Sequence, residues 1–214
     1  MFDIRLRSLK DGLFNPLCQF IPSSISPGLI TFLAFLSGLL SIYLASQRSI
    51  LPSLLFWFLN RSLDCLDGAL ARHRNIASDL GGFLDLLADF WIYSLLPIGI
   101  AVGWDVSSSC LLSVAFLEAT FHVNNFILFY VAAIAEKKAN DQPARARTKE
   151  LTSVMMRPAF VEGMESGVLF TLMLAFPNYI GMWCGLMAAA VGVGIGQRTY
   201  WVVNALRFPT PIKN

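Results

Sequence analysis

Six apolar stretches, each close to 20 residues long, dominate this chain and limit what it can fold into. A helix needs about 20 mostly apolar residues to cross the hydrocarbon core of a bilayer. The stretches cover residues 27–46, 51–71, 81–103, 109–133, 158–177 and 180–204. Only 14% of the 214 residues are charged, whereas about 25% are charged in an average soluble domain. The sequence therefore predicts an all-α, polytopic membrane protein of six transmembrane helices, forming a single domain over residues 1–214.

Basic residues indicate which side of the membrane each loop faces, because cytoplasmic loops carry an excess of lysine and arginine. These residues gather before the first stretch, after the second, after the fourth and after the sixth, whereas the opposite loops carry only Arg48. We expect both termini and the region 64–89 on the cytoplasmic side of the inner membrane. Because the net charge is only +2 and the basic residues are spread over loops, membrane lipids are expected partners and nucleic acids are not.

The N-terminal segment 1–22 is expected to be an interfacial helix and linker. Phe2, Leu6, Leu9 and Leu13 recur at helical spacing among charged residues, which is typical of an amphipathic helix lying in the membrane interface. A solvated charged tail is the alternative. The charges interrupt the apolar core that a cleavable secretory signal needs, so the segment is not expected to be removed.

Four aspartates, at positions 64, 67, 85 and 89, lie within or beside the second and third apolar stretches. On a helix, Asp64 and Asp67 share one stripe with Gly68, Ala71 and Arg72, and Asp85 and Asp89 share another with Gly81. The short turn between these helices makes them antiparallel neighbours, so the two stripes are expected to meet. Just before them, Arg61 is expected to neutralise a carboxylate and Asn60 to extend the polar cleft.

Carboxylates in an apolar segment are costly unless cations compensate them, so this region predicts a metal site. Oxygen ligands favour Mg²⁺ or Mn²⁺, and four carboxylates can hold two ions, an arrangement suited to displacement at phosphorus. Gly68, Gly81 and Ala71 would let a ligand approach the helix backbone closely, although tight helix packing explains each of them equally well. Arg72 offers a fork for a phosphate oxygen.

The pattern DxxDGxxAR, eight further residues and then GxxxDxxxD runs from Asp64 to Asp89 without a substitution. On this motif the chain resembles the CDP-alcohol phosphotransferase (CDP-alcohol phosphatidyltransferase) family. Many members of that family also begin the first span with Pro-Asn and a nearby Thr, and this chain has Pro27, Gly28 and Thr31 there. The resemblance implies a six-helix membrane fold with an N-terminal interfacial helix.

The resemblance also implies a reaction, in which a phosphatidyl or other substituted phosphate group moves from a CDP-linked donor to an alcohol and CMP leaves. CDP-diacylglycerol is the usual donor, and the products are phospholipids. By family analogy, the general base is Asp89, which also contacts metal. The principal metal ligands would be Asp64, Asp67 and Asp85, and the cytidine diphosphate pocket would be lined by Gly68, Ala71, Arg72, Ser78 and Gly81. Asp79 lies off the motif and is expected to be a solvated cap residue.

The acceptor pocket has weaker candidates. Arg157 and Arg198 are basic residues at the start of the fifth stretch and inside the sixth. Arg198 either binds an anionic acceptor or pairs with Glu162 or Glu165 as a structural salt bridge, and we favour the salt bridge. Glu118 and His122, four residues apart, are expected to form a buried hydrogen-bonded pair rather than a catalytic one.

Other features leave alternatives open. Three GxxxG spacings, at 163/167, 181/185 and 192/196, favour close helix packing within the chain over the face of a homodimer. The four cysteines have no CxxC spacing and are expected to be free thiols. A cation transporter or channel would also explain buried aspartates, but not the glycines, Ala71 and Arg72 that accompany them.

Overall fold

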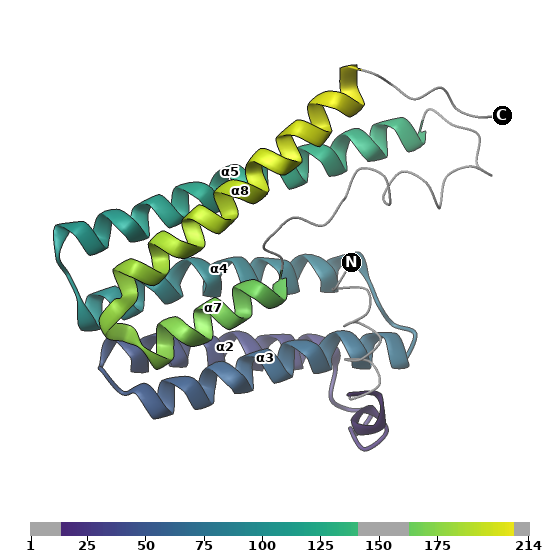
Figure 1. Ribbon diagram of the computed structural model, residues 1–214. Helices are drawn as coiled ribbons and strands as arrows, with labels where there is room; N and C mark the ends of the chain where they lie inside the picture. The colour runs from purple at the N-terminus through teal and green to yellow at the C-terminus, as the bar shows by residue number, and fades with distance from the viewer. Residues whose placement is uncertain (1–13, 141–162, 208–214) are drawn as a thin grey trace.

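The computed structural model describes residues 14–140 and 163–207 of the chain (Figure 1). These residues contain helices and turns and no β-strand, which confirms the all-α prediction. The main helices are α2 (Pro27–Ser46), α3 (Ile50–His73), α4 (Asp79–Trp104), α5 (Ser108–Asn140), α7 (Gly163–Ala175) and α8 (Ile180–Arg207), with a short 3₁₀ turn η1 (Pro177–Tyr179) before α8. The expected interfacial helix at residues 2–13, the start of the fifth stretch and Arg157 lie outside the described residues.

Four of the described helices are long and apolar enough to cross a membrane: Pro27–Ser46, Asp79–Trp104, Ser108–Ile134 and Pro177–Asn204. Helix α7 is shorter, at 13 residues, and α3 has the length but carries charged side chains in its second half. Many large apolar side chains of these helices are exposed, as a lipid-facing surface requires. The fold is therefore that of a membrane protein.

A local hydrogen bond caps the start of α2, and longer-range hydrogen bonds hold it beside the turn between α3 and α4. Helix α2 begins where Ser26 Oγ accepts the amide of Leu29 at 3.2 Å, with Pro27 in the first turn. Arg74, at the end of α3, donates to the carbonyl of Ile25 at 2.6 Å and to two further carbonyls of the segment that precedes α2. The start of α2 is thereby held beside the end of α3.

Helices α2, α3 and α4 pack closely because small residues lie at their contacts. Ser41 and Ser53 each donate to the other's backbone carbonyl, at 2.8 and 2.9 Å, which joins α2 to α3 without leaving a polar group unpaired. A Cβ atom at Gly103 would lie 2.7 Å from the carbonyl oxygens of Ala45 and Ser46. Only glycine allows α4 to approach the end of α2 this closely.

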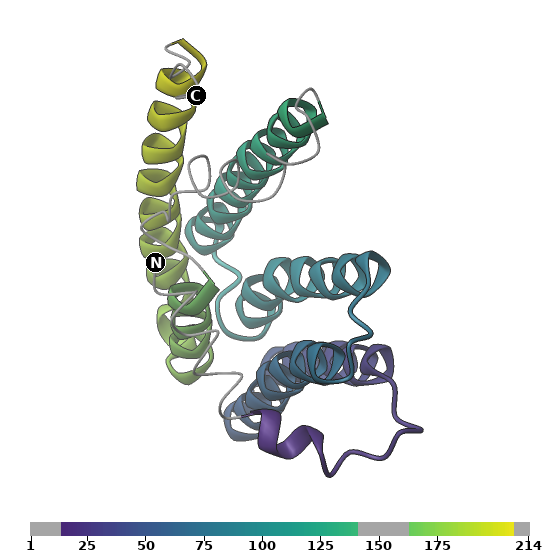
Figure 2. The same ribbon diagram turned by 90° about the vertical axis from the view of Figure 1, so that its right-hand side faces the viewer.

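The main hydrophobic core joins α3, α4, α5, α7 and α8. At its centre, Phe170 of α7 packs edge-on to Trp57, with ring centroids 5.9 Å apart, and stacks on Tyr93 at 5.0 Å. Cys110 and Cys184 are buried in the same core, and all four cysteines are free thiols, as predicted. Helices α5 and α8 pack against each other and spread apart toward their C-terminal ends (Figure 2).

The glycines on α7 and α8 correct one prediction. A Cβ atom at Gly181 would lie 3.4 Å from Cys110 Cα, so this glycine does pack within the chain. Gly167, Gly185, Gly192 and Gly196 have open space there instead, with no atom of another described segment within 4 Å. Packing between the described helices therefore does not explain these four glycines, although it does explain Gly181.

Candidate active site

A polar cavity of about 610 Å³ lies where the start of α2, the end of α3 and the start of α4 meet. Seven of the predicted site residues line it: Asp67, Gly68, Ala71, Arg72, Ser78, Gly81 and Asp85. Helix α2 adds Pro27, Gly28 and Thr31. The predicted meeting of two stripes across a short turn is thus correct, and a third helix closes the cavity.

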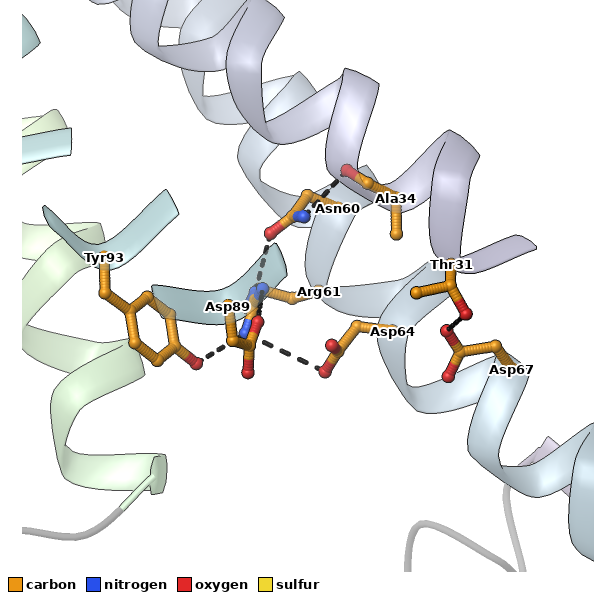
Figure 3. A network of polar contacts seen from close by, with 8 residues as sticks. All are labelled: Thr31, Ala34, Asn60, Arg61, Asp64, Asp67, Asp89 and Tyr93. Carbon is orange, nitrogen blue, oxygen red and sulfur yellow. Dashed lines mark hydrogen bonds and ion pairs between the residues drawn. The ribbon is translucent and has the colours of Figure 1, made fainter. Parts of the chain in front are cut away.

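Asp67 is the most buried of the four aspartates, with 4% of its surface exposed. Its Oδ2 accepts a 2.5 Å hydrogen bond from Thr31 Oγ1, which reaches across from α2 (Figure 3). The same hydroxyl also lies 3.2 Å from the Pro27 carbonyl, a longer and weaker contact. Asp67 is therefore held at the wall of the cavity by a residue 36 positions earlier in the chain.

Asp64 and Asp89 are not among the residues that line this cavity and lie beside the guanidinium of Arg61 (Figure 3). Arg61 Nη2 donates to Asp89 Oδ1 at 2.7 Å, and its Nη1 lies 3.8 Å from Asp64 Oδ2. Arg61 therefore does neutralise carboxylates, as predicted, and its stronger partner is on the neighbouring helix. Asp85, which lines the cavity, lies one helical turn before Asp89 on α4, so this group adjoins the cavity.

The donor chemistry of these aspartates fits a hard divalent cation, because all four offer carboxylate oxygens from adjacent turns of α3 and α4. Within residues 14–140 and 163–207, no three acidic, histidine or cysteine side chains are already arranged around one point as ligands. Thr31 and Arg61 hold Asp67 and Asp89 in hydrogen bonds instead.

The non-acidic motif residues shape the cavity. A Cβ atom at Gly68 would lie 3.1 Å from Arg72 Nη1, so glycine leaves space for that guanidinium beside the α3 backbone. Ser78 is the N-cap of α4, and its Oγ accepts the amide of Gly81 at 3.2 Å. Because this oxygen acts as an acceptor there, the hydroxyl hydrogen can be donated to a ligand in the cavity. Asp79, next to it, is exposed in the first turn of α4, as predicted.

An apolar groove of about 310 Å³ continues from the polar cavity along α2 and α4. Gly28, Thr31 and Leu84 line both spaces. The rest of the groove is lined by Phe32, Phe35, Leu87, Ala88 and Trp91. The sequence analysis missed this groove, because its two walls come from helices whose pairing no motif indicates.

Of the predicted acceptor residues, Arg157 lies outside the described residues, and Arg198 is not in the cavity lining. Arg198 of α8 donates to Asn124 Oδ1 of α5, a contact that was not predicted. Glu118 Oε1 is buried without a hydrogen-bond partner among the described residues, and His122 is exposed. The predicted buried pair of Glu118 and His122 is therefore wrong, because the two side chains point to different environments despite their helical spacing.

Two aromatic residues that contact Arg61 were also missed. Its guanidinium lies 5.1 Å from the ring centres of both Trp57 and Tyr93, and the Tyr93 hydroxyl accepts a hydrogen bond from Nη1 at 2.6 Å. A signal for Tyr93 was present, since it follows Asp89 by four residues and extends the same helical stripe. Trp57 likewise precedes Arg61 by four residues.

A membrane fold that gathers carboxylates, an arginine and glycine backbone around one cavity, next to an apolar groove, is typical of a membrane-embedded enzyme that acts on a phosphate-containing substrate. Residues 24–195 match the family model described as CDP-alcohol phosphatidyltransferase. The chain belongs to this family. It is therefore a metal-dependent transferase that moves a substituted phosphate group from a CDP-linked donor to an alcohol and releases CMP.

Individual relatives agree with this assignment. The inner membrane protein YnjF of Escherichia coli is 33% identical over 175 residues, which cover 77% of each chain. The fold matches the phosphatidylinositol phosphate synthase PgsA1 of Mycobacterium tuberculosis in its structure with CDP-DAG bound, with a TM-score of 0.65, 17% identity and coverage of 97% of this chain and 98% of that one. A second PgsA1 structure, with manganese and citrate, matches with a TM-score of 0.62, 17% identity and coverage of 91% and 88%. These matches do not support a transporter or channel.

Proposed function

We propose that this enzyme uses CDP-diacylglycerol as its donor and transfers the phosphatidyl group to an alcohol at the cytoplasmic face of the inner membrane. The observation that supports a lipid donor is the continuity of the polar cavity with the apolar groove through Gly28, Thr31 and Leu84. A nucleotide diphosphate fits the first space and an acyl chain the second. The bound CDP-DAG in the PgsA1 structure is consistent with this proposal.

In this proposal two Mg²⁺ or Mn²⁺ ions are held by Asp64, Asp67, Asp85 and Asp89. Bound there, the ions supply positive charge against the diphosphate and the departing CMP. Arg72 binds a phosphate oxygen, and Ser78 donates its hydroxyl hydrogen to the cytidine diphosphate. Gly68, Ala71 and Gly81 have no side chain or only a methyl group, so the nucleotide lies close to the helix backbone there. The protein thus contributes mainly orientation and electrostatics.

Asp89 is proposed as the general base. The acceptor hydroxyl oxygen attacks the phosphorus of the phosphatidyl group, its proton passes to the Asp89 carboxylate, and the bond from phosphorus to the CMP oxygen breaks with its electron pair. Since Arg61 binds Oδ1 of Asp89, the other oxygen is the one that can take this proton. Among the described residues, Arg198 is the candidate for binding an anionic acceptor, and its contact with Asn124 equally suits a structural role.

The positions of the helix ends and the open glycine faces of α8 support an orientation in the membrane and a dimer. The start of α2, the turn from α3 to α4 and the ends of α5 and α8 all lie toward one end of the molecule (Figure 1). The basic loops are attached at this end, so we place it in the cytoplasm. The open glycine faces at Gly185, Gly192 and Gly196 support a homodimer through α8.

The test is CMP release by the purified protein with CDP-diacylglycerol, Mg²⁺ or Mn²⁺ and a panel of acceptors: glycerol 3-phosphate, inositol phosphate, serine and phosphatidylglycerol. Asp89→Asn should abolish turnover and leave metal binding largely intact, whereas the exposed Asp79→Asn should behave as wild type. Full activity of Asp89→Asn would remove Asp89 from the mechanism. Failure of the wild type to bind any cytidine nucleotide in the presence of metal would refute the function itself.

A further inference from the structure

Arg61 is a permanent positive charge placed among the aspartates, and the family motif does not include it. We propose that Arg61 competes with a divalent cation for Asp89 and Asp64, and so limits metal affinity while orienting Asp89. This inference rests on the proposed function, since it takes these two carboxylates as metal ligands.

The position of Arg61 does not depend on Asp89 alone. Its Nη1 donates to the Tyr93 hydroxyl at 2.6 Å and its Nε to Asn60 Oδ1 at 2.7 Å. The guanidinium also lies between the rings of Trp57 and Tyr93, each 5.1 Å away. These contacts hold the charge in place whichever way the Asp89 carboxylate turns.

Asn60 is itself fixed, which makes the arrangement rigid. Its amide nitrogen donates to the Ala34 carbonyl of α2 at 2.8 Å, and the side chain is 2% exposed. The Arg61 guanidinium is therefore anchored through α2, α3 and α4 together (Figure 3). A side chain held this way is built to stay near the carboxylates rather than to leave when a metal ion binds.

A fixed guanidinium has two effects on a neighbouring metal ion. Its Nη2 donates to Asp89 Oδ1 at 2.7 Å, so this hydrogen bond must be shared or broken before the oxygen can bind a metal ion. Its charge also repels a divalent cation, and little solvent screens the repulsion in a site that is about four-fifths buried. Arginine keeps this charge at any pH at which the protein is folded. Removing the charge should therefore tighten metal binding.

The same contact should assist the chemistry. With Oδ1 held by Arg61, the Asp89 carboxylate has one orientation, and its second oxygen is presented to the reacting hydroxyl. Loss of Arg61 should consequently lower kcat while it strengthens metal binding. A residue with a merely structural role would weaken both properties or change neither.

The experiment measures Mn²⁺ binding to the purified full chain in detergent, without nucleotide, from the electron paramagnetic resonance signal of free Mn²⁺. We expect Arg61→Gln to bind Mn²⁺ about tenfold more tightly than wild type, with a kcat lowered about tenfold or more. Arg61→Lys keeps the charge and should retain the wild-type Mn²⁺ affinity. Arg74→Gln removes a cation at the C-terminal end of α3 whose hydrogen bonds within the described part of the chain go to backbone carbonyls, and it should also retain the wild-type affinity.

Unchanged or weaker Mn²⁺ binding by folded Arg61→Gln would overturn the inference. If that variant does not fold, Arg61→Met gives the same test, because it also removes the charge and keeps an unbranched side chain beside the rings of Trp57 and Tyr93. It should tighten Mn²⁺ binding about tenfold as well, and no tightening would overturn the inference in that case. Absence of Mn²⁺ binding by the wild type would instead refute the proposed metal site, so the two failures are distinguishable.

Discussion

Replacing Thr31 by valine tests how the protein positions a buried carboxylate. Valine has nearly the shape of threonine but no hydroxyl, so Thr31→Val removes the 2.5 Å hydrogen bond to Asp67 without creating a cavity. Asp67 is only 4% exposed, and water cannot fully replace the lost donor. We expect the freed carboxylate to rotate away from the orientation in which it binds metal.

The size of the effect follows from the geometry. A hydrogen bond to a charged group contributes about 1.5–3 kcal/mol, and each 1.4 kcal/mol is about tenfold in an equilibrium constant. Residues that orient metal ligands commonly change metal affinity by about 10- to 100-fold when they are replaced. We therefore expect Thr31→Val to weaken Mn²⁺ binding about 10- to 100-fold. The sign is opposite to that for Arg61, because threonine orients a ligand without bringing a positive charge that repels the ion.

The assay is Mn²⁺ titration of the purified protein, with Thr31→Ser as the matched control. Serine keeps the hydroxyl and should retain most of the wild-type affinity. A thermal unfolding measurement on both variants separates loss of orientation from loss of fold. If folded Thr31→Val binds Mn²⁺ as tightly as Thr31→Ser, the hydrogen bond does not position Asp67 and the reasoning fails.

Two further predictions concern glycines, one in the helix packing and one at the entrance to the groove. Gly103→Ala should lower the free energy of unfolding by about 1–3 kcal/mol, because its Cβ would lie 2.7 Å from two carbonyl oxygens. Gly82→Ala, where the Cβ would meet open space, should be neutral or stabilising. Thermal unfolding compares the two variants, and equal stabilities would contradict the prediction. Gly28→Leu should reduce CMP release from CDP-diacylglycerol much more than from a soluble CDP-alcohol, because its side chain would enter the space shared by cavity and groove. Equal losses with both donors would show that no acyl chain passes Gly28.

The membrane helices could be predicted from the sequence because the bilayer dictates their length and composition. The first stretch, 27–46, coincides with α2, whose start is fixed by Ser26 and Pro27. Helix α5 continues to Asn140, beyond the predicted end at residue 133, so the end of the apolar stretch does not mark the end of the helix. The close approach of α2 and α4 at Gly103 had no sequence signal, since it depends on a contact between distant segments.

The site was predictable where local spacing controls it. Asp67 and Asp85 meet at one cavity because a short turn joins their helices, and helical periodicity determines which face each occupies. The hydrogen bond from Thr31 to Asp67 spans 36 residues, so no periodicity could reveal it. For Arg61 the sequence predicted a carboxylate partner without indicating which one, and the tertiary structure places Asp89 closer than Asp64, at 2.7 Å against 3.8 Å.

Two of the four carboxylates are held by hydrogen bonds from opposite sides of the site. Thr31 binds Asp67 from the α2 side, where the cavity opens, whereas Arg61 binds Asp89 from the side of the aromatic core. Asp85 lines the same cavity as Asp67 and lies one helical turn before Asp89. A metal ion entering from the cavity would therefore meet Asp67 and Asp85 before the arginine-held Asp89. Because the Arg61 cation is bound to Asp89, we expect the carboxylate proposed as base to bind metal least readily and to stay available to accept a proton.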